Sequence, residues 1–179
     1  PMDTYSSGDE KKQKMFRSIA LDRNQESSIL QIRNDVPKEL AGVQWINMGF
    51  YAYSPYVPFY TNIENTPADY QVADHTVDPD HSAYWLYKTL QVLVEPRYHQ
   101  YIYQINAYRD ECQSYGVGRV SEIDKEAKDK HGDMLTSFLT SANEVTANEI
   151  TKKTKTLMSD LVRQALNSSK YQFERGDNL

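Results

Sequence analysis

Residues 23–26, Arg-Asn-Gln-Glu, are the side chains in this sequence best suited to chemistry. Four hydrogen-bonding groups stand in a row between two runs of alternating apolar and polar residues. Arginine binds carboxylates through two parallel hydrogen bonds, and such a cluster at the end of a strand can also orient a catalytic group. The alternative, a plain surface hairpin, stays open at this point.

The other titratable residues form no pattern that is typical of a catalytic or metal centre. The four histidines are not at ligand spacing, so neither a metal site nor a cofactor is expected. The seven glycines are scattered and form no phosphate-binding loop. Cys112 lies on the apolar stripe of a predicted helix without a nearby His base, which predicts a buried packing thiol rather than a nucleophile.

Residues 50–78 are predicted to form an aromatic loop. Prolines at 55, 58 and 67 exclude a regular helix and interrupt strand ladders. Six of the residues between 50 and 60 are aromatic, and rigid aromatic loops often line a binding cleft. In the other interpretation, the aromatic residues cover one face of a sheet. The two interpretations are compatible.

Period-two alternation predicts three antiparallel strands within residues 16–49, at 17–23, 28–33 and 43–49. Residues 24–26 are short enough to join the first two strands as a hairpin. Val36-Pro37 ends the second strand, because the residue before proline favours extended geometry. A lone meander has open edges and an uncovered face. The sequence after it supplies helices and no further clear strands, which indicates a missing partner.

Residues 79–169 are predicted to be long amphipathic helices. Asp78 is the expected N-cap and Pro79 the first helical residue, with breaks at Pro96, at a turn over 115–118, and near Gly132. The last helix could instead dimerise as a coiled coil, so a homo-oligomer remains an alternative. Polar residues 1–15 and 170–179 are expected to be tails.

The composition argues against several classes of protein. The net charge of -5 and the pI near 5.4 argue against a nucleic-acid partner, which requires a concentrated basic surface. No apolar run approaches the length that spans a membrane. The single cysteine excludes an intrachain disulfide and suits a reducing compartment such as the cytoplasm.

Three motifs carry a family resemblance: SIALDRNQESSILQIR, GVQWINMG and SPYVPFYTNIENTPADY. Together they resemble the C-terminal part of the bacterial cysteine dipeptidases, which are N-terminal-nucleophile (Ntn) hydrolases. The matching positions are Arg23, Gln25, Glu26, Leu30, Gln31, Arg33, Trp45 and residues 57–60. The resemblance is good over about residues 17–115 and looser beyond.

The resemblance implies an α+β fold that forms part of an Ntn αββα sandwich, with residues 16–169 as the C-terminal part of one domain. It also implies hydrolysis of dipeptides by an N-terminal Cys, whose thiolate attacks the peptide carbonyl while the α-amino group acts as base. Pro1 is no such nucleophile and Cys112 lies in mid-chain, so no catalytic residue is expected in this fragment. The nucleophile would lie upstream, in the remainder of the same enzyme.

Two hypotheses follow. In the first, the chain is an inactive piece of a dipeptidase, and Arg23, Asn24, Tyr56 and Tyr60 contact the dipeptide substrate. In the second, it is a non-catalytic helical protein-interaction module that carries a small meander.

Overall fold

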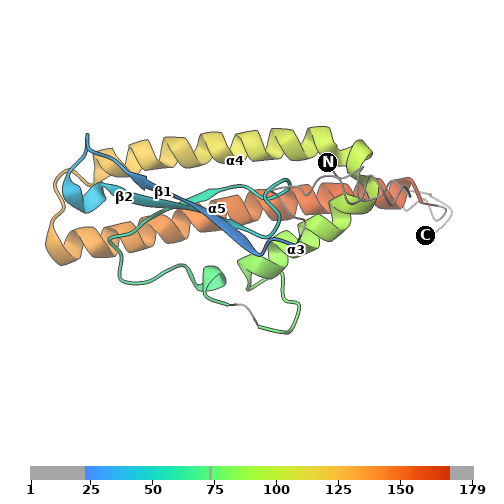
Figure 1. The fold of residues 1–179 in the computed structure, drawn as a ribbon, viewed down its shortest axis with the longest axis horizontal. Coiled ribbons are helices and arrows are strands. Elements are labelled where there is room, and N and C mark those ends of the chain that lie inside the picture. The colour runs from blue at the N-terminus through green and yellow to red at the C-terminus, as the bar shows by residue number, and fades with distance from the viewer. Residues whose placement is uncertain (1–22, 73, 170–179) are drawn as a thin grey trace, which may run out of the picture.

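The computed structural model describes residues 23–72 and 74–169 (Figure 1). These residues form an antiparallel sheet followed by long helices, which confirms the predicted α+β class. The strands are β1 (Glu26–Ile32), β2 (Gly42–Met48) and β3 (Val57–Tyr60), and the α-helices are α3 (Ala83–Val94), α4 (Tyr98–Glu126) and α5 (Gly132–Asn167). Short 3-10 helices lie at Lys38–Leu40, Ala68–Tyr70 and Glu95–Arg97. No described helix has the length and apolar character needed to cross a membrane.

The sheet has the order β1-β2-β3, with both neighbouring pairs antiparallel. The strands expected at 28–33 and 43–49 are present as β1 and β2, each shifted by one or two residues. In β2 the alternation is clear, because Val43 and Trp45 are buried while Gln44 and Ile46 are partly exposed. Most of the strand expected at 17–23 lies outside the described residues, and Arg23 itself is in a turn.

The third described strand, β3, lies where only a loop was expected, and that part of the prediction is wrong. Pro58 was taken to interrupt a ladder. The amide of Thr61 donates to the carbonyl of Gly42 at 3.2 Å, so the alternate residues of β3 direct their backbone groups toward β2. Pro58 stands at an intervening position, where a proline removes no ladder hydrogen bond.

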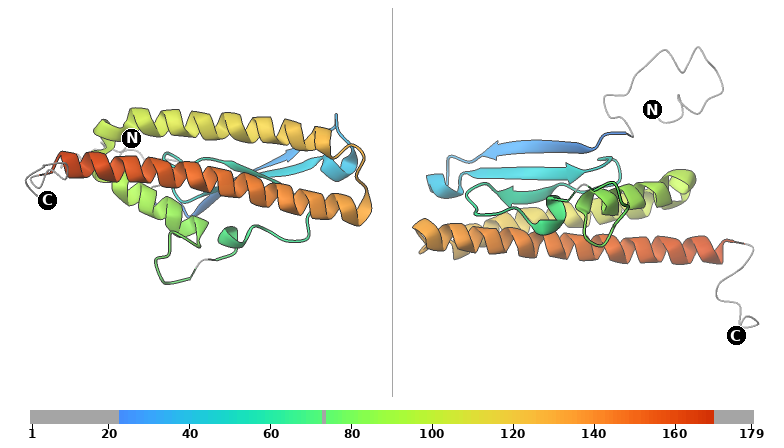
Figure 2. Two further views of the ribbon diagram at one scale, coloured as in Figure 1. Left: turned by 180° about the vertical axis from the view of Figure 1, so that it is seen from behind. Right: turned by 90° about the horizontal axis from the view of Figure 1, so that it is seen from below.

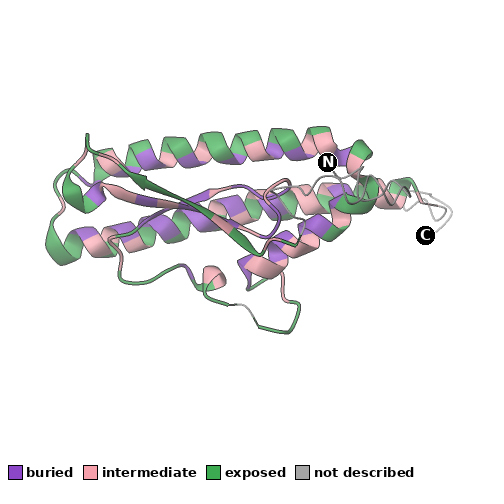
Figure 3. Cartoon of the chain, in the orientation of Figure 1, coloured by how far each residue is buried: buried purple, intermediate pink, exposed green. Residues whose placement is uncertain are grey.

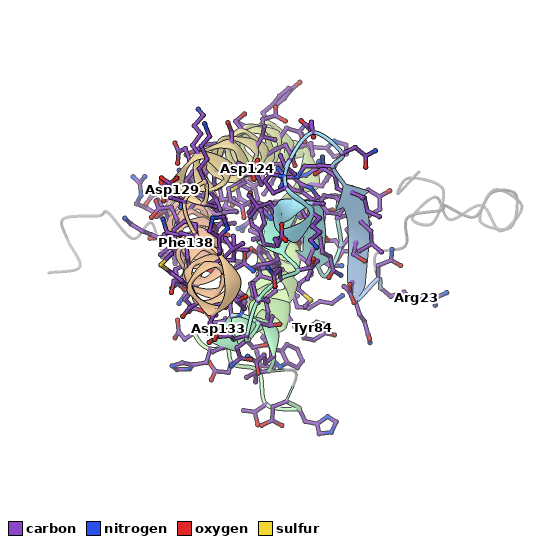
Figure 4. All side chains as sticks on the ribbon, turned by 90° about the vertical axis from the view of Figure 1, so that its left-hand side faces the viewer. Arg23, Tyr84, Asp124, Asp129, Asp133 and Phe138 are labelled. Atoms are coloured by element: carbon purple, nitrogen blue, oxygen red, sulfur yellow. The ribbon has the colours of Figure 1, made fainter. Side chains whose placement is uncertain are left out.

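Helices cover both faces of the inner part of the sheet. Figure 2 and the end-on view in Figure 4 show β3 closest to the α4–α5 pair and β1 farthest from it. Val43, Trp45 and Tyr60 belong to one apolar cluster with the later turns of α4 and the first half of α5. Val57 and Phe59, on the other face, belong to a second cluster with α3, the first half of α4 and the second half of α5.

The first helix of this group begins later than expected. Helix α3 starts at Ala83, and its N-cap is Ser82, whose Oγ accepts a hydrogen bond from the amide of Trp85 at 3.4 Å. Asp78 instead accepts from the amides of Asp80 and His81, at 3.1 and 3.2 Å, and closes a turn ahead of the helix. The predicted N-cap chemistry of Asp78 is therefore present, but in a turn rather than at a helix end.

Helix α4 runs straight through residues 115–118, where a turn was expected. Gly116 faces the sheet there: a Cβ at this position would lie 3.1 Å from Pro58 Cδ and 3.2 Å from Trp45 Cζ3. Glycine thus allows the helix to approach the sheet closely instead of breaking it. The break expected near Gly132 is confirmed, since Gly132 begins α5 with a φ of +53°, a conformation that glycine adopts readily.

Candidate functional site

An aromatic hollow of about 560 Å³ lies between β1 and α4. Hydrogen bonds hold Trp45 and Tyr56 of its lining to β1. Trp45 Nε1 donates to Gln31 Oε1 at 2.9 Å, and the hydroxyls of Tyr56 and Ser27 lie 2.9 Å apart. The residues that line it are Ile29, Leu30, Gln31, Ile32, Trp45, Tyr56 and Gln113. This set offers apolar contact, two amide side chains and the hydroxyl of Tyr56, so the hollow is suited to binding and positioning a ligand.

A second cleft, of about 410 Å³, lies between residues 35–40 and the α4–α5 connection. Apolar, acidic and basic side chains all contribute to its lining. The lining includes Asp35, Glu39, Leu40, Asp124, Lys128, Lys130, His131 and Leu135. Asp124 and the backbone of Leu40 in this lining are both held by hydrogen bonds from Arg33.

That network joins β1, β3 and α4. The Arg33 guanidinium donates two hydrogen bonds to the Asp124 carboxylate, at 2.5 and 3.0 Å, and lies 5.4 Å from the centre of the Tyr60 ring. The Tyr60 hydroxyl points at Asp124 Oδ1 at 2.7 Å and at the carbonyl of Val120 at 3.0 Å. The Arg33 and Asp124 side chains are only 10% and 21% exposed.

The electrostatics of this network favour fixed charges over proton transfer. Burial raises the pKa of Tyr60, and the neighbouring Asp124 carboxylate raises it further. Burial alone would lower the pKa of Arg33, but its bonds to Asp124 and its proximity to Tyr60 leave that pKa raised. Near neutral pH Tyr60 therefore keeps its proton and Arg33 its charge, as expected of a structural lock between three elements.

The four residues expected to contact substrate lie in different surroundings. Arg23 is exposed beyond the start of β1 and points away from the helices (Figure 4). The backbone carbonyl of Asn24 accepts a hydrogen bond from Lys88 Nζ at 3.2 Å. Tyr56 lines the aromatic hollow, whereas Tyr60 is buried in the Arg33–Asp124 network. The described residues alone do not gather these four around one cavity.

Cys112 has the environment expected of a packing thiol. It is fully buried in the cluster that contains Tyr108 and Ile105. Burial raises the pKa of the Cys112 thiol to about 12, so almost none of it is thiolate at neutral pH. Among the described residues, no group of three or more His, Cys, Asp or Glu side chains is placed to hold a metal ion.

We expect Cys112 to be nearly unreactive toward a thiol reagent such as DTNB at pH 8 in the folded chain. Burial blocks access, and a pKa of about 12 leaves very little thiolate, so labelling should be at least about a hundredfold slower than in the urea-unfolded chain. Stopped-flow absorbance measures both rates. Equal rates in the two states would show that the thiol is accessible and activated.

Comparison with known proteins identifies the family. Residues 1–111 match the model of peptidase family C69, and this match covers more than half of the chain. The chain belongs to peptidase family C69. Among curated relatives, it is 32% identical over 177 residues to the probable dipeptidase of Latilactobacillus sakei, a match that covers 99% of this chain and 37% of that protein.

Two further relatives give the same picture. Probable dipeptidase B of Lactococcus lactis is 35% identical, with 96% of this chain and 36% of the relative covered. Dipeptidase A of Lactobacillus helveticus is 34% identical, with 90% and 34% covered. The chain thus spans about a third of the length of the curated relatives it matches. The resemblance to bacterial dipeptidases is confirmed.

Several residues of the C69-like motif make structural contacts that the sequence did not reveal. Gln31 fixes the indole of Trp45, and Arg33 binds Asp124, which is 91 positions away. Asn143 of α5 was not singled out, yet its amide bonds both backbone groups of Tyr60, at 3.0 Å each. The partners of Arg33 and Tyr60 are Asp124 of α4 and Asn143 of α5. Because these helices are distant from the strands in sequence, a single sequence gives no signal for the contacts.

Proposed function

We propose that this chain is the C-terminal portion of a cytoplasmic dipeptidase that cleaves the peptide bond of dipeptides. The observation that carries the proposal is the C69 family match, together with relatives named as dipeptidases along nearly the whole chain. The α+β arrangement of strands and helices is consistent with part of an Ntn-type fold.

In this proposal the nucleophile is an N-terminal Cys outside this chain. Its thiolate adds to the peptide carbonyl, the α-amino group accepts the thiol proton and passes it to the leaving amine, and water then hydrolyses the thioester. This chain contributes no group to those steps. Its part is to form walls of the substrate cleft, with Arg23 and Asn24 at the outer end of β1 and Tyr56 at the aromatic hollow.

A chimera tests the proposal. The matched region of the Latilactobacillus sakei protein is replaced by this chain, and the chimera, the unaltered relative and the isolated chain are assayed on a panel of dipeptides. We expect hydrolysis by the first two and none by the isolated chain. A folded chimera that fails on dipeptides cleaved by the relative would contradict the proposal and favour the interaction-module hypothesis. Hydrolysis by the isolated chain would contradict the upstream nucleophile.

Within the active chimera, Arg23→Ala is expected to lower kcat/KM by roughly tenfold to a hundredfold. The reason is the loss of a charge-assisted hydrogen bond to the substrate carboxylate. Arg163→Ala is the matched control, because Arg163 is also exposed and pairs only with Asp160 on the same helix in the described structure. If Arg23→Ala changed kcat/KM as little as the control does, Arg23 would not be part of the substrate site.

A further inference from the structure

Arg109 of α4 is an arginine without a partner among the residues that the structure describes. It is half-buried, its Nε is enclosed by protein, and it forms no hydrogen bond or ion pair with another described residue. No carboxylate lies one turn away on its own helix, where the residues are Ile105, Asn106, Cys112 and Gln113. A charged group that is partly removed from water is normally paired, so Arg109 is available to bind an anion.

The other described arginines differ from Arg109. Three of them pair with an Asp or Glu side chain, namely Arg33, Arg119 and Arg163. Arg23 and Arg97 have no ion pair in the described structure, but both are exposed, so water solvates their guanidinium groups. Among the described arginines, Arg109 alone combines partial burial with the lack of an acidic partner.

The contacts along α4 show where Arg109 lies relative to the aromatic hollow. Asp124 binds Arg33 just after β1, and Gln113, three turns earlier on α4, lines the hollow. Arg109 precedes Gln113 by four residues, so the two side chains are neighbours on one face of the helix, with Cβ atoms about 5–6 Å apart. Arg109 therefore lies at the end of the hollow that is opposite the Arg33–Asp124 network.

The hollow itself is lined by uncharged residues. Its wall on β1 carries three apolar side chains that are largely in water: Ile29, Leu30 and Ile32 are 53%, 75% and 79% exposed. In Figure 3, the buried residues of α4 face the sheet and α5, while β1 is largely exposed. An apolar side chain of a ligand would cover this wall, whereas a charged one would lose hydration without gaining a partner.

We propose that the hollow and Arg109 together recognise the C-terminal residue of the dipeptide substrate, with its apolar side chain in the hollow and its carboxylate on Arg109. This inference rests on the proposed function and names the substrate class, dipeptides with a C-terminal aliphatic or aromatic residue. Arginine suits the role because its planar guanidinium donates two parallel hydrogen bonds to one carboxylate. The side chain and the carboxylate of a C-terminal residue share one carbon, which agrees with two subsites one helical turn apart.

Arg23 is compatible with this arrangement. It precedes β1 at the same end of the hollow as Arg109, because Glu26 pairs with Met48 where β2 ends. A carboxylate accepts about four hydrogen bonds, so Arg23 can bind it from the solvent side and Arg109 from the helix side. Arg109 is the more buried of the two arginines, so its bond to a carboxylate is less weakened by water.

A dipeptide and its C-terminal amide test the carboxylate contact in the chimera described above. For Ala-Leu against Ala-Leu amide, we expect kcat/KM to favour the acid by at least about a hundredfold. Arg109→Gln should lower this ratio below about tenfold, and Arg109→Lys should give an intermediate ratio, because lysine keeps the charge without the paired hydrogen bonds. Arg97→Gln, the same change at an exposed arginine, is the control. Equal ratios in Arg109→Gln and in the control would overturn the proposal.

The side-chain contact is tested with Ala-Phe, Ala-Leu, Ala-Asp and Ala-Lys. We expect kcat/KM of the first two to exceed that of the last two by at least about tenfold. Gln113→Lys places a charge on the wall of the hollow and should raise kcat/KM for Ala-Asp relative to Ala-Leu by at least about fivefold. Ser114→Lys is the control, since Ser114 is exposed on the same helix but does not line the hollow. If the two variants changed this ratio equally, the hollow would not hold the substrate side chain.

Binding to the folded chimera separates this inference from the proposed function. The probe is an analogue of Ala-Leu in which a CH₂–NH link replaces the peptide bond, and calorimetry measures its Kd without hydrolysis. Hydrolysis whose acid-to-amide ratio is insensitive to Arg109→Gln would contradict this inference alone. Binding of the analogue that Arg109→Gln weakens by at least about tenfold, without hydrolysis, would contradict only the proposed function. Absence of both binding and hydrolysis would contradict both.

The thermal stability of the chimera identifies the other possible partner of Arg109, a carboxylate side chain from the rest of the enzyme. In that case Arg109→Gln would lower the Tm of the ligand-free chimera, Arg97→Gln would not, and the acid-to-amide ratio would stay the same. This combination would assign Arg109 to a structural ion pair and overturn the proposal. If Arg109 binds the substrate, the two variants should have the same Tm without ligand, and only Arg109→Gln should change the ratio.

Discussion

Replacing Arg33 with alanine should lower the free energy of unfolding by about 3 kcal/mol, because it leaves the largely buried Asp124 carboxylate without its partner. The guanidinium also donates to the carbonyl of Leu40 at 2.5 Å, so the substitution further loosens the connection between β1 and β2. Urea unfolding followed by circular dichroism measures the change.

The control is Arg163→Ala, which removes an ion pair whose two side chains are 60% and 50% exposed. Such a surface pair contributes at most about 1 kcal/mol. Arg33→Lys is expected to fall between these variants, since lysine keeps the charge but cannot form both bonds to Asp124. If Arg33→Ala were as mild as Arg163→Ala, the network would not be what holds β1 and β3 to α4.

Sequence periodicity predicted β1 and β2 but missed β3, and the reason is burial. Strand β2 alternates because one set of its side chains is buried and the other is partly exposed. All four residues of β3 are buried, because the helices cover both of its faces. A strand covered on both faces has no period-two signal. The proline at 58 then made a loop the natural prediction.

The helices were predictable as amphipathic segments, whereas their interruptions depended on tertiary contacts. Gly116 was predicted as a turn, but its lack of a side chain is used for packing against Trp45 and Pro58. Asp78 was predicted as an N-cap, but Ser82 takes that position. The use of Gly116 was decided by neighbours that are distant in sequence. Asp78 keeps its capping propensity but applies it to amides only two and three positions away.

The candidate site was only partly accessible to sequence reasoning, for a related reason. Tyr60 was expected to contact the dipeptide substrate. In the sequence, an aromatic binding loop and a buried aromatic strand look alike. Its partners Asp124 and Asn143 lie 64 and 83 positions away. The pattern around Arg33 identified the family, but its ion pair could be assigned only once α4 was placed against the sheet.

Asn143→Leu is expected to lower the free energy of unfolding by about 3 kcal/mol. Asn143 is buried, and its side chain accepts from the amide of Tyr60 and donates to its carbonyl. Leucine has a similar size and favours helix, but it leaves two buried backbone groups without partners, at a cost of about 1–3 kcal/mol each. Urea unfolding gives the free energy, and hydrogen exchange should show a less protected Tyr60 amide.

Asn148→Leu is the matched control, since it makes the same chemical change on the same helix at an exposed residue that bonds only to Glu144 in the described structure. A surface substitution of this kind changes stability by about 0.5 kcal/mol or less. A difference between the two variants would show that one amide of α5 closes the β3 edge. Equal stabilities would mean that the packing of α5 against β3 holds this strand without the Asn143 amide.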